Sequence, residues 1–227
     1  MDFLEYSYQK HAENFAKDLV DENRIRISES WFNENTADYW RHDRAYECVD
    51  HLLSENPEAS WITVGDGRWG LDSIRIKKKG FSHVLPTDIS EPLLKAAKDR
   101  GYISEYAVEN SERLSFVDGA FDYVFCKESL HHFPRPYLAL YEMLRVARRA
   151  VFCIEPNDHA GVNSLGGAHY LSFRSSLRQT LRLFFMRLRS KGAYLPITRR
   201  SAISNFLRRA WLGKCGQLCI WSFQTGV

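Results

Sequence analysis

Short apolar runs alternate with segments of helical periodicity through the middle of the chain. Five runs rich in β-branched and aromatic residues are typical of strands: 60–64, 83–87, 105–108, 121–126 and 151–154. Four segments with apolar residues at helical spacing precede or separate them: 36–56, 71–79, 90–100 and 137–147. Because parallel strands need crossover helices that pack on the sheet, this alternation predicts an α/β fold with a mainly parallel sheet and helices on both faces.

Capping residues mark the ends of two predicted helices. Asn56-Pro57 ends the first, because the residue before a proline avoids the helical conformation. Ser90 is a typical N-cap residue with Pro92 in the turn that follows it, and Gly101 comes after the last turn of that helix. We therefore expect Ser90 to cap the helix 90–100.

The pattern weakens beyond Pro156. Residues 171–189 carry Phe and Leu at helical spacing with arginines beside them, which predicts an amphipathic helix. Residues 218–223 are apolar enough to form one further strand.

The composition is that of a folded protein with a large core. Of the 227 residues, 44% are hydrophobic and 14% aromatic, which excludes disordered and fibrous classes. Segment 1–14 is charged throughout, and no window approaches the about 18 apolar residues of a membrane span. Five cysteines without a Cys-x-x-Cys pair fit reduced thiols better than a disulfide framework or a zinc site. We therefore expect a cytoplasmic protein without a bound metal.

Charge is divided unevenly along the chain. Residues 1–158 hold 28 acidic and 20 basic side chains, whereas residues 159–227 hold 11 basic and no acidic ones. This asymmetry predicts an anionic partner for the C-terminal third, either a membrane surface, a nucleic acid or a phosphorylated substrate.

Three interpretations of the basic segment 171–209 stay open. The first is a helix that packs its Phe and Leu face on the core. The second is an interfacial helix at an anionic membrane surface, where arginines beside Phe and Leu suit the headgroup boundary. The third is nucleic-acid binding, which we do not expect because the sequence contains no zinc knuckle or RNP-like motif.

The strongest chemical signal is a glycine-rich turn directly after the first predicted strand. Gly65, Gly67 and Gly70 have the spacing Gly-x-Gly-x-x-Gly, and Asp88 ends the next strand 18 residues after the third glycine. The glycines allow a tight turn close to a ligand, and a carboxylate at this position accepts hydrogen bonds from a ribose diol. An ordinary turn with an exposed Asp is the alternative. Together, strand, turn, helix and Asp predict a site for a nucleotide-type cofactor.

Two cofactors fit this motif, a nicotinamide dinucleotide and S-adenosylmethionine. Tyr123 and Lys127 have the spacing of the Tyr/Lys pair of short-chain dehydrogenases, which requires a helix to bring the side chains together. Here the pair lies in a predicted strand, which would separate the two residues by roughly 13 Å. The pair is therefore discarded, which disfavours an NAD-dependent oxidoreductase or epimerase; this function stays the first alternative.

Residues 61–158 resemble the class I S-adenosylmethionine-dependent methyltransferases, of the small-molecule type related to the ubiquinone and menaquinone methyltransferases. Four segments carry the resemblance in order: the glycine turn 64–70, the acidic strand end 87–90, 108–116 and 121–133. The resemblance implies a Rossmann-like sheet, S-adenosylmethionine as cofactor, and transfer of its methyl group to a small-molecule acceptor.

The cofactor contacts that we expect involve eight residues: Gly65, Asp66, Gly67, Asp88, Ile89, Asn110, Ser111 and Lys127. By the resemblance, the first glycines face the methionine part, Asp88 holds the ribose hydroxyls, and Asn110 with Ser111 holds the adenine. Ile89 would cover a ring face. A residue that caps its own loop is the alternative role of Asn110.

One departure from the family pattern lies at the expected cofactor site. The residue two before Gly65 is commonly acidic in the family and lies near the cofactor's amino group, but here it is Thr63. Asp66 is a candidate substitute for that acid. The departure also supports a second alternative function, a non-catalytic module that keeps the fold and binds a partner through its basic segment.

The candidate catalytic residues follow the fourth predicted strand. Methyl transfer from a sulfonium chiefly needs alignment, but an oxygen or nitrogen acceptor also has a proton to lose. His132 or His131 is expected to act as the base, with Glu128 as orienting partner or substrate ligand. The alternative is that these histidines pack or cap the turn that follows. Asn157 or Asp158, after the fifth strand, could contact the acceptor.

We expect three parts: an N-terminal helical cap (1–59), a Rossmann-like cofactor-binding core (60–158) and a basic amphipathic segment (159–227). The family's fold closes with two further antiparallel strands, whereas residues 190–227 offer one, so we expect the C-terminal part to be incomplete or rebuilt. A sugar of a surface glycan or a lipid-linked precursor is the expected acceptor, because segments 64–67 and 127–136 look like methyltransferases associated with polysaccharide biosynthesis.

Overall fold

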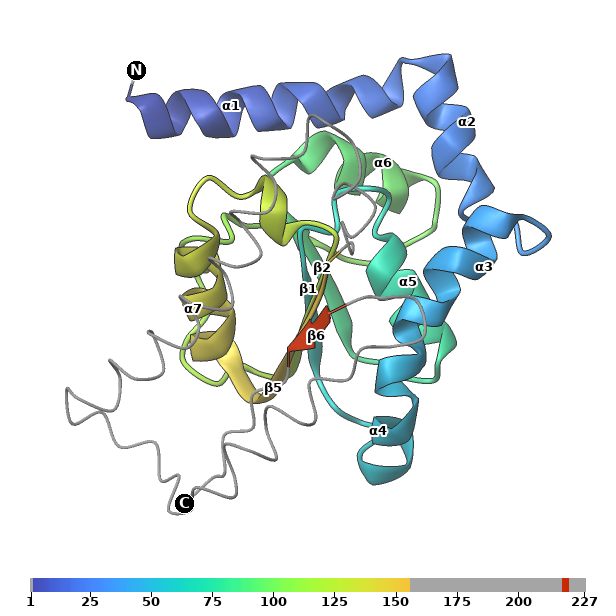
Figure 1. Cartoon of the computed structure of the whole chain (residues 1–227), viewed down its shortest axis with the longest axis vertical. Coiled ribbons are helices and arrows are strands. Elements are labelled where there is room, and N and C mark those ends of the chain that lie inside the picture. Colours follow the sequence, from blue (N-terminus) through green and yellow to red (C-terminus); the bar gives the residue numbers. More distant parts are fainter. Residues whose placement is uncertain (1, 156–217, 221–227) are drawn as a thin grey trace, which may run out of the picture. The chain divides into compact units, whose positions relative to one another are not determined.

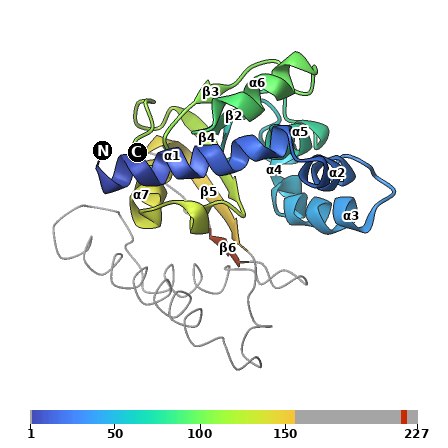
Figure 2. The same cartoon turned by 90° about the horizontal axis from the view of Figure 1, so that it is seen from above.

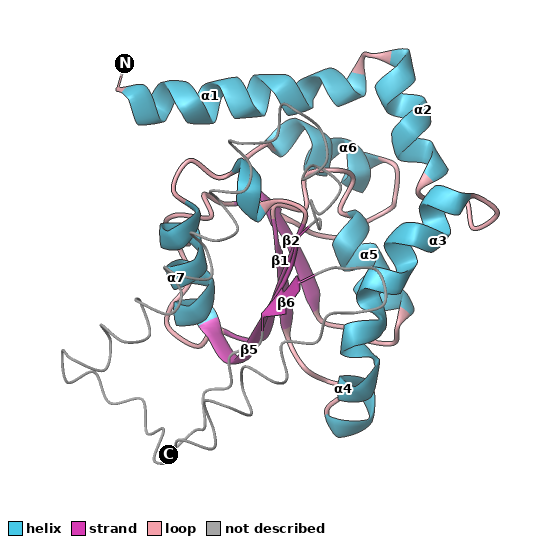
Figure 3. Ribbon diagram, in the orientation of Figure 1, coloured by secondary structure: helices cyan, strands magenta, loops and turns pink. Residues whose placement is uncertain are grey.

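A parallel sheet forms the centre of the described chain, which comprises residues 2–155 and 218–220 in a computed structural model. Its strands are β1 (Trp61–Val64), β2 (Val84–Asp88), β3 (Ala107–Val108), β4 (Phe121–Lys127), β5 (Ala147–Glu155) and β6 (Leu218–Ile220). They lie in the order β3-β2-β1-β4-β5-β6, and the pairs from β3 to β5 are all parallel. Figure 3 colours the strands magenta, in the orientation of Figure 1. The expected five-stranded, Rossmann-like parallel sheet is therefore confirmed.

Helices cover both faces of this sheet. The α-helices are α1 (Phe3–Ala16), α2 (Glu22–Ser30), α3 (Ala37–Asp43), α4 (Asp50–Glu55), α5 (Leu71–Lys78), α6 (Glu91–Asp99) and α7 (Pro136–Val146). Short 3-10 helices lie at Lys17–Leu19, Arg44–Val49 and Leu130–His132. In Figure 1 the sheet is seen nearly edge-on, with α7 on one side and α4 and α5 on the other. None of the helices in the described residues combines the length and apolar character that a bilayer crossing requires.

Aromatic rings from three neighbouring strands hold one face of the core together. The ring of Trp61 on β1 lies 4.5 Å from that of Tyr123 on β4 and 5.7 Å from that of Phe152 on β5, centroid to centroid. Tyr46 stacks on Phe125 of β4 at 5.3 Å. Because large buried aromatic side chains contribute strongly to core stability, this cluster fixes the 3-10 helix Arg44–Val49 and α4 against the strands that lead to the site.

Two expectations about the helices need correction. The segment 36–56 is not one continuous helix, because 3-10 geometry over Arg44–Val49 separates α3 from α4. Tyr46 and Val49, three residues apart, are both fully buried, and a 3-10 helix places residues at this spacing on the same side. Ser90 does occupy the N-cap position of α6, but its buried hydroxyl makes no hydrogen bond within the described residues.

The C-terminal expectations are tested only at β6. The amphipathic helix expected at 171–189 lies outside the described residues, and so do Asn157 and Asp158. Of the strand expected at 218–223, the structure describes β6 beside β5. The division into three parts at residues 59 and 158 stays a prediction.

Candidate functional site

The glycine turn after β1 is shaped by contacts that exclude side chains. Gly65 has φ +78°, and a Cβ placed on it would lie 2.5 Å from Cβ of Ser129. A Cβ on Gly67 would lie 2.6 Å from the carboxyl carbon of Asp88. The two glycines therefore let the loops after β4 and β2 approach the turn, which no other residue type would allow.

Asp66 lies beneath this turn and caps α5. Its carboxylate accepts hydrogen bonds from the backbone N–H groups of Asp72 and Ser73, both at 2.9 Å, and from the hydroxyl of Thr63 at 2.8 Å. The side chain is buried, and this burial, reinforced by the charge of Asp72, holds the pKa of Asp66 well above its usual range. Asp66 does not line the cavity described below, where its expected role as the acid near the amino group would place it.

Asp88 lies at the carboxyl end of β2, directly opposite the glycine turn. One carboxylate oxygen accepts the N–H of Gly67 at 2.9 Å, and the other accepts the N–H of Ser90 at 2.7 Å. Burial outweighs these hydrogen bonds and raises the pKa of Asp88 to about 6. The carboxylate is thus oriented by the backbone and borders the cavity.

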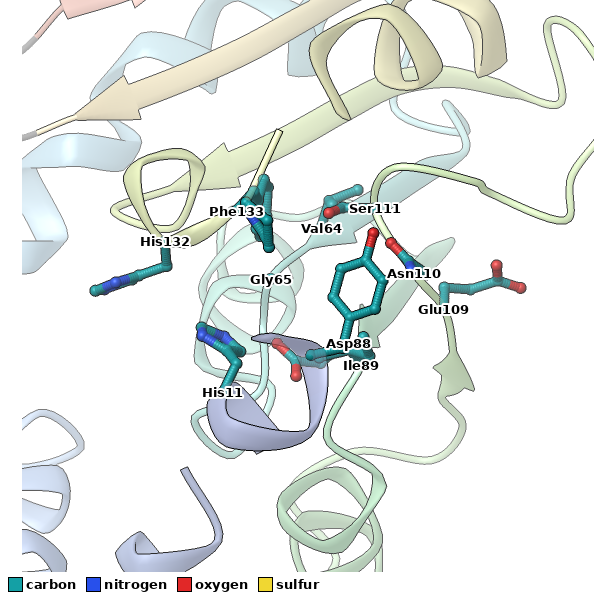
Figure 4. A pocket seen from close by; sticks show the side chains of 12 residues that line it. His11, Val64, Gly65, Asp88, Ile89, Glu109, Asn110, Ser111, His132 and Phe133 are labelled. Atoms are coloured by element: carbon teal, nitrogen blue, oxygen red, sulfur yellow. The ribbon is translucent and has the colours of Figure 1, made fainter. Parts of the chain in front are cut away.

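Residues from five separate segments surround one cavity at this end of the sheet (Figure 4). Its lining consists of Tyr8, His11, Val64, Gly65, Asp88, Ile89, Glu109, Asn110, Ser111, His132, Phe133 and Pro134. Six of the expected site residues are among them: Gly65, Asp88, Ile89, Asn110, Ser111 and His132. The structure therefore brings the glycine turn, the acidic strand end, the third-strand loop and one histidine together.

Asn110 combines the two roles considered for it. Its side-chain oxygen accepts the N–H of Glu112 at 2.9 Å, which caps the turn after β3. The amide NH₂ of the same side chain is left as a donor at the cavity wall, next to Ser111. A purine edge needs such donors and acceptors, so the loop-capping role does not remove the binding role.

The two histidines have different surroundings. The ring of His132 lies between those of His11 and Phe15, at centroid distances of 5.8 and 5.9 Å. Burial, assisted by the neighbouring His131 and His11, lowers the pKa of His132 to about 4, so this imidazole is neutral at physiological pH. His131 does not line the cavity, and its Nδ1 lies 2.5 Å from Oε2 of Glu155.

Lys127 and Glu128 form a separate cluster beyond the cavity lining. The amine of the buried Lys127 lies 2.9 Å from Nδ1 of His42 and 3.1 Å from Oε2 of Glu128. Glu128 has φ +52°, a left-handed backbone conformation that is uncommon for a residue other than glycine. Glu128, which was expected to orient His131 or His132, pairs with Lys127 instead and lies 3.8 Å from His42. The carboxylate that pairs with His131 is Glu155.

Six cavity residues were not among the site residues expected from the sequence. Tyr8 and His11 come from α1, Val64 ends β1, Glu109 follows β3, and Phe133 with Pro134 follows the last 3-10 helix. The first pair lies more than 50 residues before the glycine turn, and nothing in its local pattern indicates a site. Val64, Glu109 and Phe133 lie inside segments that carried the resemblance, which was the available signal, and Pro134 directly follows the last of these segments.

The fold and the site define a Rossmann-like domain with a cavity at the carboxyl ends of its strands, which is where open α/β sheets bind their ligands. Residues 62–154 match the family model of the methyltransferase domain. This segment is therefore similar to the methyltransferase domain, a family whose S-adenosylmethionine-dependent members use S-adenosylmethionine as cofactor. Among curated proteins, none matches the sequence significantly.

Several solved structures are similar to part of the chain. The YcgJ protein from Bacillus subtilis is 18% identical over 50% of this chain and 50% of its own, with a TM-score of 0.44. The PH0226 protein from Pyrococcus horikoshii is 23% identical over 56% of this chain and 62% of its own, with a TM-score of 0.46. A SAM-dependent methyltransferase from Methanosarcina mazei is 24% identical over 45% of this chain and 55% of its own, with a TM-score of 0.41. The match thus spans about half to three fifths of the length of these proteins.

Proposed function

We propose that the chain is an S-adenosylmethionine-dependent methyltransferase that acts on a small-molecule acceptor. The observation that carries the proposal is the Asp88 carboxylate, oriented by Gly67 and Ser90 at the wall of a cavity that also contains Gly65, Asn110 and Ser111. These groups fit the cofactor: an ionised carboxylate accepts two ribose hydroxyls, and amide and hydroxyl groups match an adenine edge.

We assign the cofactor contacts on this basis. Gly65 would lie against the methionine part, Asp88 would bind the ribose, and Asn110 with Ser111 would bind the adenine beside Ile89. Gly67 acts by orienting Asp88. Asp66 and Lys127, which make buried contacts away from the cavity, are given structural roles in place of the cofactor contacts expected from the sequence.

His132 is the group that we propose for removing the acceptor's proton. The bound sulfonium supplies an activated methyl group, so the protein's part is to align the acceptor and to accept a proton where the acceptor has one to lose. With a pKa of about 4, His132 is in its neutral, proton-accepting form at neutral pH. His131, paired with Glu155, would hold the loop that carries His132.

The acceptor that we propose is a sugar hydroxyl of a surface glycan or a lipid-linked precursor. The support is the likeness of segments 64–67 and 127–136 to methyltransferases associated with polysaccharide biosynthesis. The 11 basic residues without acids in 159–227 are suited to an anionic membrane surface, where such precursors are assembled.

Calorimetric titration tests the proposal without knowledge of the acceptor. The full chain is titrated with S-adenosylmethionine, S-adenosylhomocysteine and NAD, beside an Asp88→Ala variant and an Asp99→Ala control at the exposed end of α6. We expect micromolar binding of the first two ligands, loss of that binding in Asp88→Ala and no change in the control. Binding of NAD alone would favour an oxidoreductase, and binding of none would favour a non-catalytic module.

A further inference from the structure

Helix α1 borders the cavity without being buried itself. None of its 14 residues is buried, yet Tyr8 and His11 are part of the cavity wall. Figure 2 shows the helix passing across the sheet, and Figure 4 shows His11 facing the loop that carries His132. A helix that covers a site with so little burial is held in place by a few specific contacts.

The C-terminal end of α1 is firmly fixed. Phe15 and Leu19 pack against an apolar cluster that includes Trp69. The carboxylate of Asp18 is fully buried and accepts hydrogen bonds from Arg68 of the glycine turn at 2.9 Å and from Arg24 at 2.7 Å. This end therefore stays attached to the core through the 3-10 helix Lys17–Leu19 that follows α1.

The N-terminal half of α1 is held by a polar contact. The hydroxyl of Tyr8 donates to Oε2 of Glu112 at 2.7 Å, and Arg135 donates to both oxygens of the same carboxylate, at 2.7 Å from its backbone N–H and 2.5 Å from its Nε. Arg135 Nη2 also lies 3.3 Å from the Tyr8 oxygen. Phe3 and Tyr6, the aromatic residues nearest this end, are 80% and 50% exposed and add little apolar anchorage.

The position of Glu112 connects this contact to the cavity. Its backbone N–H donates to the side chain of Asn110, and Ser111 between them lines the cavity. Glu112 is itself buried and stays bound to Arg135 whether or not Tyr8 is present. Removing the Tyr8 hydroxyl therefore frees the helix without dismantling the loop beneath it.

We propose that α1 is a lid over the cofactor cavity and that the contact of Tyr8 with Glu112 and Arg135 is the latch that closes it. The nature of the ligand under the lid rests on the proposed function, whereas the lid itself rests on the contacts described above. Because the lid is closed over the cavity, the latch must open before a ligand can enter and again before it can leave. Tyr8 is a positioning residue in this scheme.

Exchange kinetics of S-adenosylhomocysteine with the Tyr8→Phe variant test the latch. Loss of a hydrogen bond to a charged group is expected to raise both the association and the dissociation rate about tenfold, with little change in Kd. Tyr6→Phe, two residues earlier on the same helix, is the matched control and should leave both rates unchanged. A residue that merely contacted the ligand would raise the dissociation rate alone, and that result would overturn the proposal.

Hydrogen exchange of α1 tests the lid independently of any ligand. In Tyr8→Phe the amides of residues 6–12 should exchange at least several-fold faster than in the unmodified chain, while those of residues 18–20 keep their protection. Unchanged exchange over residues 6–12 would overturn the lid whatever the ligand experiment gives. Faster exchange together with no binding of S-adenosylhomocysteine would retain the lid and refute the proposed function.

Discussion

Asp88 shows how a single side chain combines structure and binding. Its two oxygens already accept backbone N–H groups, yet its pKa rises to about 6 because burial disfavours the charge more than two hydrogen bonds stabilise it. Any further hydrogen-bond donor would stabilise the ionised form of this buried carboxylate. Ribose hydroxyls at the cavity wall would supply such donors, so ligand binding and ionisation of Asp88 should be coupled.

This coupling predicts a pH dependence of S-adenosylhomocysteine affinity. Binding should strengthen as the pH rises from 5 to 7.5, with a midpoint near 6, because the protonated acid offers one acceptor fewer to the ribose. His132, with a pKa of about 4, stays neutral over this range. Calorimetry at several pH values measures the effect.

The Asp88→Asn variant and an Asp99→Asn control identify the group responsible. Asp88→Asn should bind about ten to one hundredfold more weakly at pH 7.5 and lose the midpoint near 6, whereas Asp99→Asn should behave like the unmodified chain. The same midpoint in Asp88→Asn would assign the pH dependence to another residue.

The start of α5 is determined by a side chain that the sequence left ambiguous. A carboxylate within a glycine-rich turn is compatible with a ligand contact and with a helix cap, and only the direction of the side chain distinguishes the two. Asp66 turns inward, where Thr63 and two N–H groups of α5 meet it. The threonine at the position where the family commonly has an acid thus pairs with an acid three residues later.

Replacement of Asp66 should therefore affect stability first. Asp66→Ala leaves two backbone donors and the Thr63 hydroxyl without their acceptor and should lower the free energy of unfolding by about 1–3 kcal/mol. Asp66→Asn keeps one acceptor oxygen and should lose less. Urea denaturation measures both. Unchanged stability together with loss of S-adenosylhomocysteine binding would show that Asp66 contacts the cofactor.

The bounds of a helix or strand could be predicted from the sequence wherever local residues determine them. The strands β1, β2, β4 and β5 and the helices α5 and α6 begin and end within a few residues of their predicted bounds, since Gly, Pro and buried apolar runs delimit them. The break between α3 and α4 was missed, because it depends on packing Tyr46 and Val49 against β4 and β5. No local pattern carries that information.

The whole molecule assembles its cavity from segments that lie far apart in the sequence. Motifs identified the glycine turn, Asp88 and the 110–111 loop, because each is a local pattern with a chemical reason. The contribution of Tyr8 and His11 could not be inferred, since it requires the path of α1 across the sheet. The surroundings of Glu128, expected to orient His131 or His132 or to bind the acceptor, could not be inferred for the same reason: it contacts Lys127 and lies 3.8 Å from His42, 86 residues earlier.

Burial of His42 should appear in the stability of the whole chain. Burial, with the nearby charge of Lys127, lowers the pKa of His42 to about 4, below its ordinary value of 6.5. The unfolded chain therefore binds more protons there between these values, and stability is lost as the pH falls below 6.5. His42→Gln should lose less stability than the unmodified chain between pH 7 and pH 5, as measured by urea denaturation.

The exposed His83 provides the comparison for this effect. His83→Gln makes the same substitution at a side chain that is 63% exposed and lies 3.3 Å from Glu58, and it should change the pH dependence of stability less than His42→Gln does. Identical pH profiles of stability for His42→Gln and the unmodified chain would show that His42 does not cause the loss of stability at low pH.

The central claim is that the cavity beneath α1 holds S-adenosylmethionine with its ribose on Asp88. A crystal structure of the full chain grown with S-adenosylhomocysteine tests it most directly. We predict the ligand between Gly65 and the 110–111 loop, with both ribose hydroxyls within hydrogen-bonding distance of the Asp88 carboxylate and Tyr8 closed on Glu112. Ligand density at another site, or a ribose that does not contact Asp88, would contradict the account.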